Sequence, residues 1–106
     1  AALSEEAKLQ RDAVAWLRLH GAVGIVHHST AAKTTCAVGV SDIICCAPNG
    51  RFVAAEAKVA KRKATEAQQS YIDEVNASGG CAFVFRSVEE LSARWSVIIA
   101  ENSASK

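Results

Sequence analysis

The sequence has almost no net charge, because its 12 basic and 11 acidic residues give a formal value of +1. Without a strong net charge, no global field attracts nucleic acid, and any basic binding surface must be local. No apolar run approaches the ~20 residues that a membrane span needs, and no basic-then-apolar signal segment opens the sequence, so we expect no membrane association. Half of the residues in the range 1–106 are apolar, which is enough for one core, and we expect a single domain.

The four cysteines lack the C-x-x-C spacing that is typical of zinc and redox sites. Cys45 and Cys46 are adjacent in an expected strand, so their side chains should point to opposite faces and cannot easily share a metal or a disulfide. Cys36 and Cys81 lie far from this pair in the sequence. The pattern favours reduced, buried cysteines of a cytosolic protein over a zinc or redox site.

Apolar periodicity and turn signals predict the element order αβββαβα. Thr65 with Gln68 has the spacing of a capping box at a helix start, and so has Ser87 with Glu90. The expected helices cover Ser4–His20, the segment from Thr65 to Gly79 and the segment from Ser87 through Ile98, and the expected strands cover Val23–His28, Val40–Ala47, Arg51–Val59 and Cys81–Phe85. A polar loop is expected over residues 29–38, and Pro48-Asn49-Gly50 predicts a turn between the second and third strands.

Three charged residues lie inside the two apolar strands that flank this turn. A turn centred on Asn49 places Asp42 opposite Glu56, because the two residues are equally distant from it. Lys58 shares the face of Glu56, since alternate residues of a strand face the same way. Two facing carboxylates repel each other, and unpaired charges in a covered strand are costly.

Two interpretations of these charges remain open on spacing alone. In the first, a hard divalent cation takes oxygen ligands from Asp42 and Glu56 and cancels their repulsion, and Lys58 holds an attacking water or a phosphate oxygen. In the second, Glu56 and Lys58 sit at an exposed strand end and pair with each other. The spacing favours neither interpretation over the other.

Several short motifs follow one another in the order Gly39-Val40-Ser41-Asp42, Glu56-Ala57-Lys58, Thr65 to Gln68, Gly79-Gly80 and Arg86 to Glu89. They resemble G-V-P-D, E-V-K, S/T-x-x-Q and the closing segment of the virus-type replication-repair nuclease (VRR-NUC) domain, a member of the PD-(D/E)xK nuclease superfamily. The resemblance runs from about Leu9 to Leu91. It implies an α/β, restriction-endonuclease-like fold with a mixed sheet flanked by helices.

The resemblance also implies metal-dependent hydrolysis of phosphodiester bonds in structured or branched DNA. Asp42 and Glu56 would hold Mg²⁺ or Mn²⁺ together with the backbone carbonyl of Ala57. Lys58 would orient or activate the water and stabilise developing charge, which is the chemistry that such a site needs. Gln68 would be a further polar group of the active site, and it can cap the second helix at the same time.

Residues next to these motifs are candidates for contacts with DNA. Lys61, Arg62 and Lys63 follow the third strand and would bind the DNA backbone without reading its sequence, although such a run can also be a solvated connection. His28 and Ser29 end the first strand, where members of the family often have polar residues near the substrate.

Two residues depart from the pattern of the family. Ser41 replaces the usual proline, and we expect little effect from this change. Lys8 stands where such domains usually carry a glutamate in the first helix. Glu5 or Asp12, which share a helical face with Lys8, could substitute for it, or the group is missing. The number of metals is therefore left open.

A symmetric homodimer would supply two sites for the two strands of a Holliday junction. The last helix carries more apolar residues than one buried stripe needs, which makes Trp95, Val97, Ile98 and Ile99 a candidate interface. The alternative to an enzyme is a non-catalytic, structure-specific DNA-binding module that keeps the nuclease fold. The family implies the cytoplasm of a bacterial or phage-infected cell as the location.

Overall fold

The computed structural model describes residues 3–28 and 39–101. Its elements are α1 (Glu5–Leu19), β1 (Val23–His27), β2 (Ile43–Cys46), β3 (Phe52–Ala57), α2 (Glu66–Ala77), β4 (Cys81–Phe85) and α3 (Val88–Glu101). The predicted order αβββαβα is confirmed. The loop predicted over residues 29–38, with Ser29 and Cys36, lies outside the described residues.

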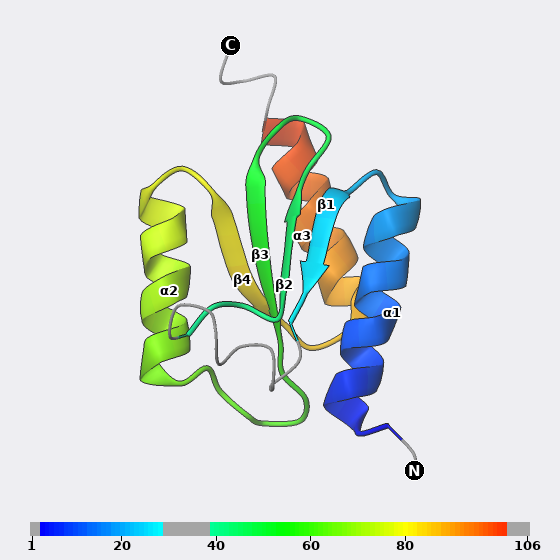
Figure 1. The fold of residues 1–106 in the computed structure, drawn as a ribbon, viewed down its shortest axis with the longest axis vertical. Coiled ribbons are helices and arrows are strands. Elements are labelled where there is room, and N and C mark those ends of the chain that lie inside the picture. The colour runs from blue at the N-terminus through cyan, green and yellow to red at the C-terminus, as the bar shows by residue number, and fades with distance from the viewer. Residues whose placement is uncertain (1–2, 29–38, 102–106) are drawn as a thin grey trace.

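The four strands form one mixed sheet in the order β1-β2-β3-β4 (Figure 1). β2 is antiparallel to both β1 and β3, whereas β3 and β4 are parallel and joined through α2. Ile43 pairs with Ala55 and Cys46 pairs with Phe52, so the register predicted from the turn at Asn49 is confirmed. That register places Asp42 directly before β2, across from Glu56 in β3.

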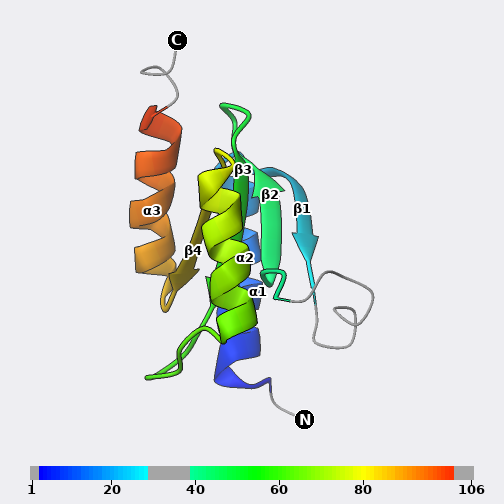
Figure 2. The same cartoon turned by 90° about the vertical axis from the view of Figure 1, so that its left-hand side faces the viewer.

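Helices cover both faces of the sheet, with α1 and α2 on opposite sides of the strands (Figures 1 and 2). The larger core cluster joins α1 and α3 to one face and includes Leu17, Ile43, Phe85, Leu91 and Trp95. The smaller cluster lies beneath α2 and consists of Ala54, Ile72 and Ala82. Among the described residues, no helix is both long and apolar enough to cross a membrane.

The hairpin strands are shorter than the predicted Val40–Ala47 and Arg51–Val59, and the charged residues provide the reason. The backbone N–H of Asp42 donates to a carboxylate oxygen of Glu56, and the N–H of Ala57 donates to a carboxylate oxygen of Asp42. Side chains thus take backbone groups that a longer ladder would pair. The regular part of β2 begins only at Ile43.

Two of the four residues of the candidate interface on α3 belong to the core of the chain itself. Trp95 and Ile98 are 2% and 3% exposed, because α3 must cover the sheet with its apolar stripe. Val97 and Ile99 remain exposed, but two residues along a helix are about 200° apart around its axis. Trp95 and Ile98 therefore form the buried stripe of α3, and the interface on this helix stays a prediction that concerns Val97 and Ile99.

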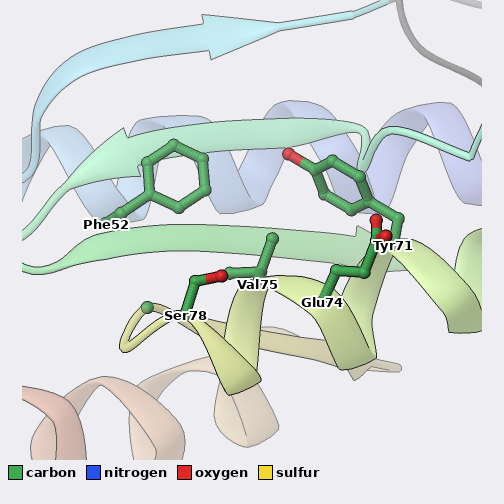
Figure 3. Close-up of a pocket in the computed structure, with 6 residues that line it drawn as sticks. Phe52, Tyr71, Glu74, Val75 and Ser78 are labelled. Carbon is green, nitrogen blue, oxygen red and sulfur yellow. The ribbon is translucent and has the colours of Figure 1, made fainter.

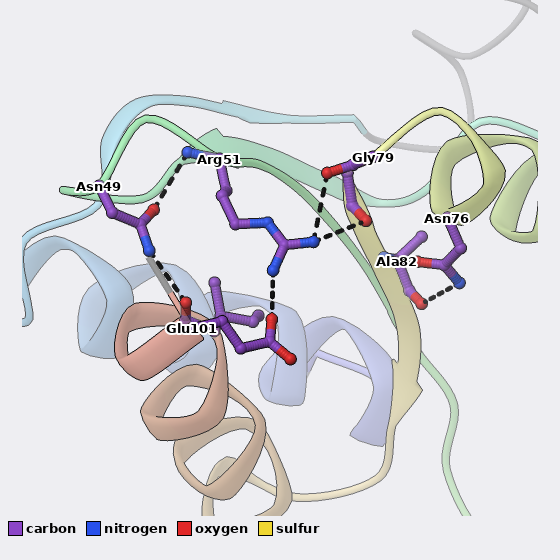
Figure 4. A network of polar contacts seen from close by, with 8 residues as sticks. Asn49, Arg51, Asn76, Gly79, Ala82 and Glu101 are labelled. Carbon is purple, nitrogen blue, oxygen red and sulfur yellow. Dashed lines mark hydrogen bonds and ion pairs between the residues drawn. The ribbon is translucent and has the colours of Figure 1, made fainter. Parts of the chain in front are cut away.

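The turn end of the hairpin is tied to the C-terminal ends of two helices (Figure 4). Asn49 Nδ2 donates to the carbonyl of Ile98 at 2.9 Å, in the last turns of α3. Arg51 forms an ion pair with Glu101 and also donates to the carbonyl of Gly79 at 3.2 Å, just after α2. These contacts fix the hairpin at the end opposite to Asp42 and Glu56.

Candidate active site

Asp42 and Glu56 exchange hydrogen bonds across the hairpin. The N–H of Asp42 donates to Glu56 Oε1 at 3.1 Å, and the N–H of Ala57 donates to Asp42 Oδ2, also at 3.1 Å. The two residues are only 5% and 1% exposed. Bonds to backbone N–H groups stabilise a buried carboxylate, so both side chains are held in place although they lie close together.

Lys58 joins this pair from the same face of β3. Its Nζ lies 3.6 Å from Glu56 Oε2, and its side chain is 6% exposed. The backbone N–H of Lys58 donates to the carbonyl of Phe85, which extends the parallel pairing of β3 and β4. The ion pair of the second interpretation therefore forms, but its exposed location is wrong, because both partners are buried.

Gln68 links α2 to the carboxylates. Its Nε2 donates to Glu56 Oε2 at 3.0 Å. Its Oε1 accepts from the N–H of Thr65 at 2.9 Å, and the Thr65 hydroxyl accepts from the N–H of Gln68, so the predicted capping box is confirmed. One side chain both caps α2 and contacts Glu56, because the amide has a donor end and an acceptor end.

Gly39 lets the start of α2 approach the loop before Asp42. Its φ is +83°, a conformation that glycine adopts without strain. A Cβ at this position would lie 2.2 Å from the carbonyl oxygen of Ala67, directly before Gln68. The glycine of the G-V-S-D motif thus sets the distance between the two segments that carry Asp42 and Gln68.

The buried charges do not balance. Asp42, Glu56 and Lys58 together carry one formal negative charge, and Gln68 is neutral. Among residues 3–28 and 39–101, no three His, Cys, Asp or Glu side chains gather closely enough to hold a metal. Mg²⁺ often binds through only one or two carboxylates and keeps several waters. The donors of this site are hard oxygens, so the residues present fit Mg²⁺ or Mn²⁺.

Of the residues predicted to contact DNA, His28 lies beside this site, and the basic segment 61–63 is exposed after β3. The backbone N–H of His28 donates to the carbonyl of Asp42 at 2.8 Å, which places His28 beside the carboxylates. Lys61, Arg62 and Lys63 are exposed after β3, and Arg62 lies 3.8 Å from Glu6 of α1. Ser29 lies outside the described residues.

Lys8, Glu5 and Asp12 lie on α1 and line a polar pocket of about 550 Å³. Val59 and Ala60, which follow Lys58, form another wall of this pocket, and Arg86 and the start of α3 complete it. All three α1 residues are exposed, so neither Glu5 nor Asp12 reaches the buried site, whereas the neighbouring Glu6 is partly buried. Lys8 occupies the central position of the three.

The cysteines are free thiols where the structure describes them, at Cys45, Cys46 and Cys81. Cys45 belongs to the core beneath α1 and α3, whereas Cys46 is half-buried, and the strand alternation predicted for them is confirmed. Burial, helped by the neighbouring Cys46, raises the pKa of Cys45 to about 11. Its thiol is therefore protonated at neutral pH, the state in which a thiol is neither a nucleophile nor a metal ligand.

Sequence reasoning missed the situation of Ser41. The residue is 1% exposed, and its hydroxyl has no hydrogen-bond partner among the described residues. Ser41 stands where the resembling family has proline, but that substitution alone does not reveal burial. The alternation of the strand gives the only signal, since it directs Ser41 to the core face, opposite to Asp42.

No family model and no curated protein matches this sequence. Among solved structures, a VRR_NUC domain protein superposes with a TM-score of 0.65, over 92% of this chain and 87% of that chain, at 24% sequence identity. The fold is VRR-NUC-like. The predicted restriction-endonuclease-like architecture, a mixed sheet flanked by helices, is thereby confirmed, and at this identity the likeness concerns the fold.

Proposed function

We propose that this VRR-NUC-like domain is a divalent-metal-dependent endonuclease that hydrolyses phosphodiester bonds in structured or branched DNA, including Holliday junctions, as a homodimer. The burial of Asp42, Glu56 and Lys58 at one point of the sheet carries this proposal. Buried charges cost stability, and a hydrolytic site explains why the chain retains an uneven set of them.

The residues that would hold Mg²⁺ or Mn²⁺ are Asp42, Glu56 and the backbone carbonyl of Ala57. When bound, the metal supplies Lewis acidity and lowers the pKa of a coordinated water. The chain itself fixes the oxygens in advance: the N–H groups of Ala57 and Asp42 hold the two carboxylates, and Gln68 holds the second oxygen of Glu56. Such support keeps a site in its working geometry.

Lys58 places a positive charge where the reaction accumulates negative charge. Its ammonium is buried and fixed by the pairing of β3 with β4, so little reorganisation is needed when charge develops on the phosphoryl oxygens. From the same position it can donate a hydrogen bond to the attacking water and orient it. Lys58 is thus the proposed catalytic residue among the three buried charges.

The substrate would enter along the exposed basic segment Lys61 to Lys63. These side chains follow Lys58 after Val59 and Ala60 and are exposed, so they can contact phosphates next to the scissile bond. Such contacts position DNA without reading its sequence. His28, whose backbone is bonded to Asp42, and Ser29 would contact the same strand at the other side of the site.

The test is cleavage of a labelled four-way junction, a flap and a plain duplex in Mg²⁺, Mn²⁺ or EDTA, with Asp42→Asn as the inactive control. We expect cutting that requires the metal, favours the branched substrates over the duplex and is lost in Asp42→Asn.

A non-catalytic DNA-binding module is the second candidate, and the exposed Lys8 at the expected glutamate position favours it. Such a module binds the junction equally well in EDTA and does not cut in Mn²⁺. That result would contradict the nuclease.

A further inference from the structure

A pocket of about 390 Å³ opens beside α2 on the same side of the sheet as Gln68 (Figure 3). Its walls come from the start of β3 and from one side of α2, through Phe52, Tyr71, Glu74, Val75, Ser78 and Gly80. In Figure 3 the rings of Phe52 and Tyr71 stand apart, with Val75 between them. The volume falls in the range of small-molecule sites, roughly 300–1,000 Å³.

The pocket exists because α2 covers only half of this face. α2 packs on β3 and β4 through Ile72, which contacts Ala54 and Ala82 in the smaller core cluster. The neighbouring part of the face stays open, and Val26 of β1 and Phe52 of β3 are 48% and 43% exposed. Large apolar side chains gathered on an open face mark a binding surface more often than isolated ones do.

The pocket lies on the same face of β3 as Glu56, toward the other end of the strand. Phe52 and Glu56 face the same side of β3 and are four residues apart, which corresponds to about 13 Å at the usual rise of a strand. Tyr71 follows Gln68 by three residues, so the two side chains are neighbours on one side of α2. Gln68 bonds to the buried Glu56, so the side of α2 that carries Tyr71 also reaches the carboxylates.

The chemistry of the lining suits a nucleobase and not a phosphate. Among the described residues, no lysine or arginine lines the pocket, and the carboxylate of Glu74 would repel an anion. Aromatic rings stack on any base, because every base has a π face. A carboxylate accepts hydrogen bonds from exocyclic amino groups, as it does with cytosine.

We propose that this pocket binds one unpaired nucleobase that bears an amino group, on the strand whose phosphate lies at Asp42 and Glu56. The inference rests on the proposed nuclease function for the identity of the ligand as DNA, and it narrows the substrate. At about 3.4 Å per nucleotide of a strand, a separation of about 13 Å places the base about four nucleotides from the scissile phosphate. A stacked, paired base cannot enter, so flaps and single-stranded branches are preferred over intact duplex.

An abasic scan tests the pocket without depending on cleavage. Binding of a labelled flap DNA is measured in EDTA, with an abasic nucleotide placed in turn at each of the first five positions of the unpaired strand. For the wild-type protein, an abasic nucleotide at one position should weaken binding about 5- to 150-fold, the usual contribution of one stacked base. An abasic nucleotide at the same position should have little effect on DNA binding by Tyr71→Leu or Phe52→Leu. These variants keep an apolar side chain but lose the aromatic ring.

Leu19→Ala is the matched control, because Leu19 is also an exposed apolar side chain but lies on α1, on the other side of the sheet from α2. It should keep the wild-type abasic profile. The proposal is refuted if no abasic position weakens binding by the wild-type protein. It is also refuted if both pocket variants keep the wild-type abasic profile. If the wild-type protein cleaves DNA in Mg²⁺ but has a flat abasic profile, the nuclease proposal stands and the base-binding pocket is refuted. If one abasic position weakens DNA binding only when Tyr71 is present, and the protein does not cleave DNA in Mg²⁺, the result supports the base-binding pocket and refutes the nuclease function.

Discussion

Asp42 and Glu56 each bond to the backbone of the opposite strand segment, and this exchange explains how two carboxylates can be buried side by side. The two hydrogen bonds and the ion pair with Lys58 offset part of the desolvation cost. The formal charges of Asp42, Glu56 and Lys58 sum to −1. At the scale of single residues, the proposed cation would stabilise this site by balancing its formal charge.

Asp42→Asn brings the formal charge of the three residues from −1 to zero and keeps the acceptor oxygen for the N–H of Ala57. We expect the melting temperature of the metal-free protein to rise by about 4 °C or more, which corresponds to ~1 kcal/mol in a domain of this size. Mn²⁺ should raise the melting temperature of the wild-type protein through preferential binding to the folded state, and this rise should vanish in the variant.

Thermal melts with and without Mn²⁺ measure both effects. Asp73→Asn is the matched control, because Asp73 is an exposed carboxylate on α2, bonded to Gln69. An equal rise with Mn²⁺ in the wild type and in Asp42→Asn would show that the metal binds elsewhere.

The pairing of Asp42 with Glu56 was predictable from residue numbers alone, because a turn residue sets the register of a hairpin. The cross-strand bonds to backbone N–H groups were not, since a strand pattern implies that the backbone pairs with backbone. The unpartnered hydroxyl of Ser41 was equally hidden, because strand alternation can indicate burial of the residue but not the absence of a partner among the described residues.

At the scale of elements, the position of α2 depends on the glycine before β2. Gly39 touches the first turn of α2, and this contact brings Gln68 within reach of Glu56. The capping box that starts α2 was predictable from Thr65 and Gln68, because capping is local. The contact with Gly39 joins segments that are far apart in sequence, so no periodicity could indicate it.

Gly39→Ala should therefore displace the start of α2 and weaken the site. Gly24→Ala is a matched control: Gly24 also has a positive φ, at 62°, but a Cβ added there would meet nothing within 4 Å. Both variants should lose ~1–2 kcal/mol to backbone strain. Gly39→Ala should lose further stability in urea unfolding and should also lose the Mn²⁺ effect. Equal losses in the two variants would show that the contact with α2 is unimportant.

At the scale of the whole molecule, the sequence predicted the sheet and its helices well, because hydrophobic patterns and turns are strong signals. It did not predict how unevenly the sheet is covered. The sequence of β3 is mainly apolar on both faces, and the strand is buried after Phe52. In the edge strand β1, by contrast, Val23 and Val26 are 59% and 48% exposed. Coverage depends on where α2 docks, and that position is a property of the assembled fold.

The proposed homodimer is a prediction at this scale. Sedimentation should give a dimer at micromolar concentration, since cutting both strands of a junction needs two sites. Because Trp95 and Ile98 serve the core, a contact on α3 would depend on the exposed Val97 and Ile99. Val97→Lys should then shift the protein to the monomer, whereas Arg94→Lys in the same helix should not. A wild-type monomer under these conditions would contradict the dimer.

The most direct test of the central claim is the single-turnover rate of cleavage of a flap DNA in Mg²⁺ by Lys58→Ala beside Lys61→Ala. Both changes remove a lysine at the end of β3, but only Lys58 is buried against Glu56. With circular dichroism confirming that both variants fold, the account predicts a rate at least about 100-fold lower for Lys58→Ala, the usual cost of losing one group that stabilises the transition state. Lys61→Ala should mainly weaken DNA binding. Equal cleavage rates for Lys58→Ala and the wild-type protein would contradict the assignment of these buried charges to catalysis.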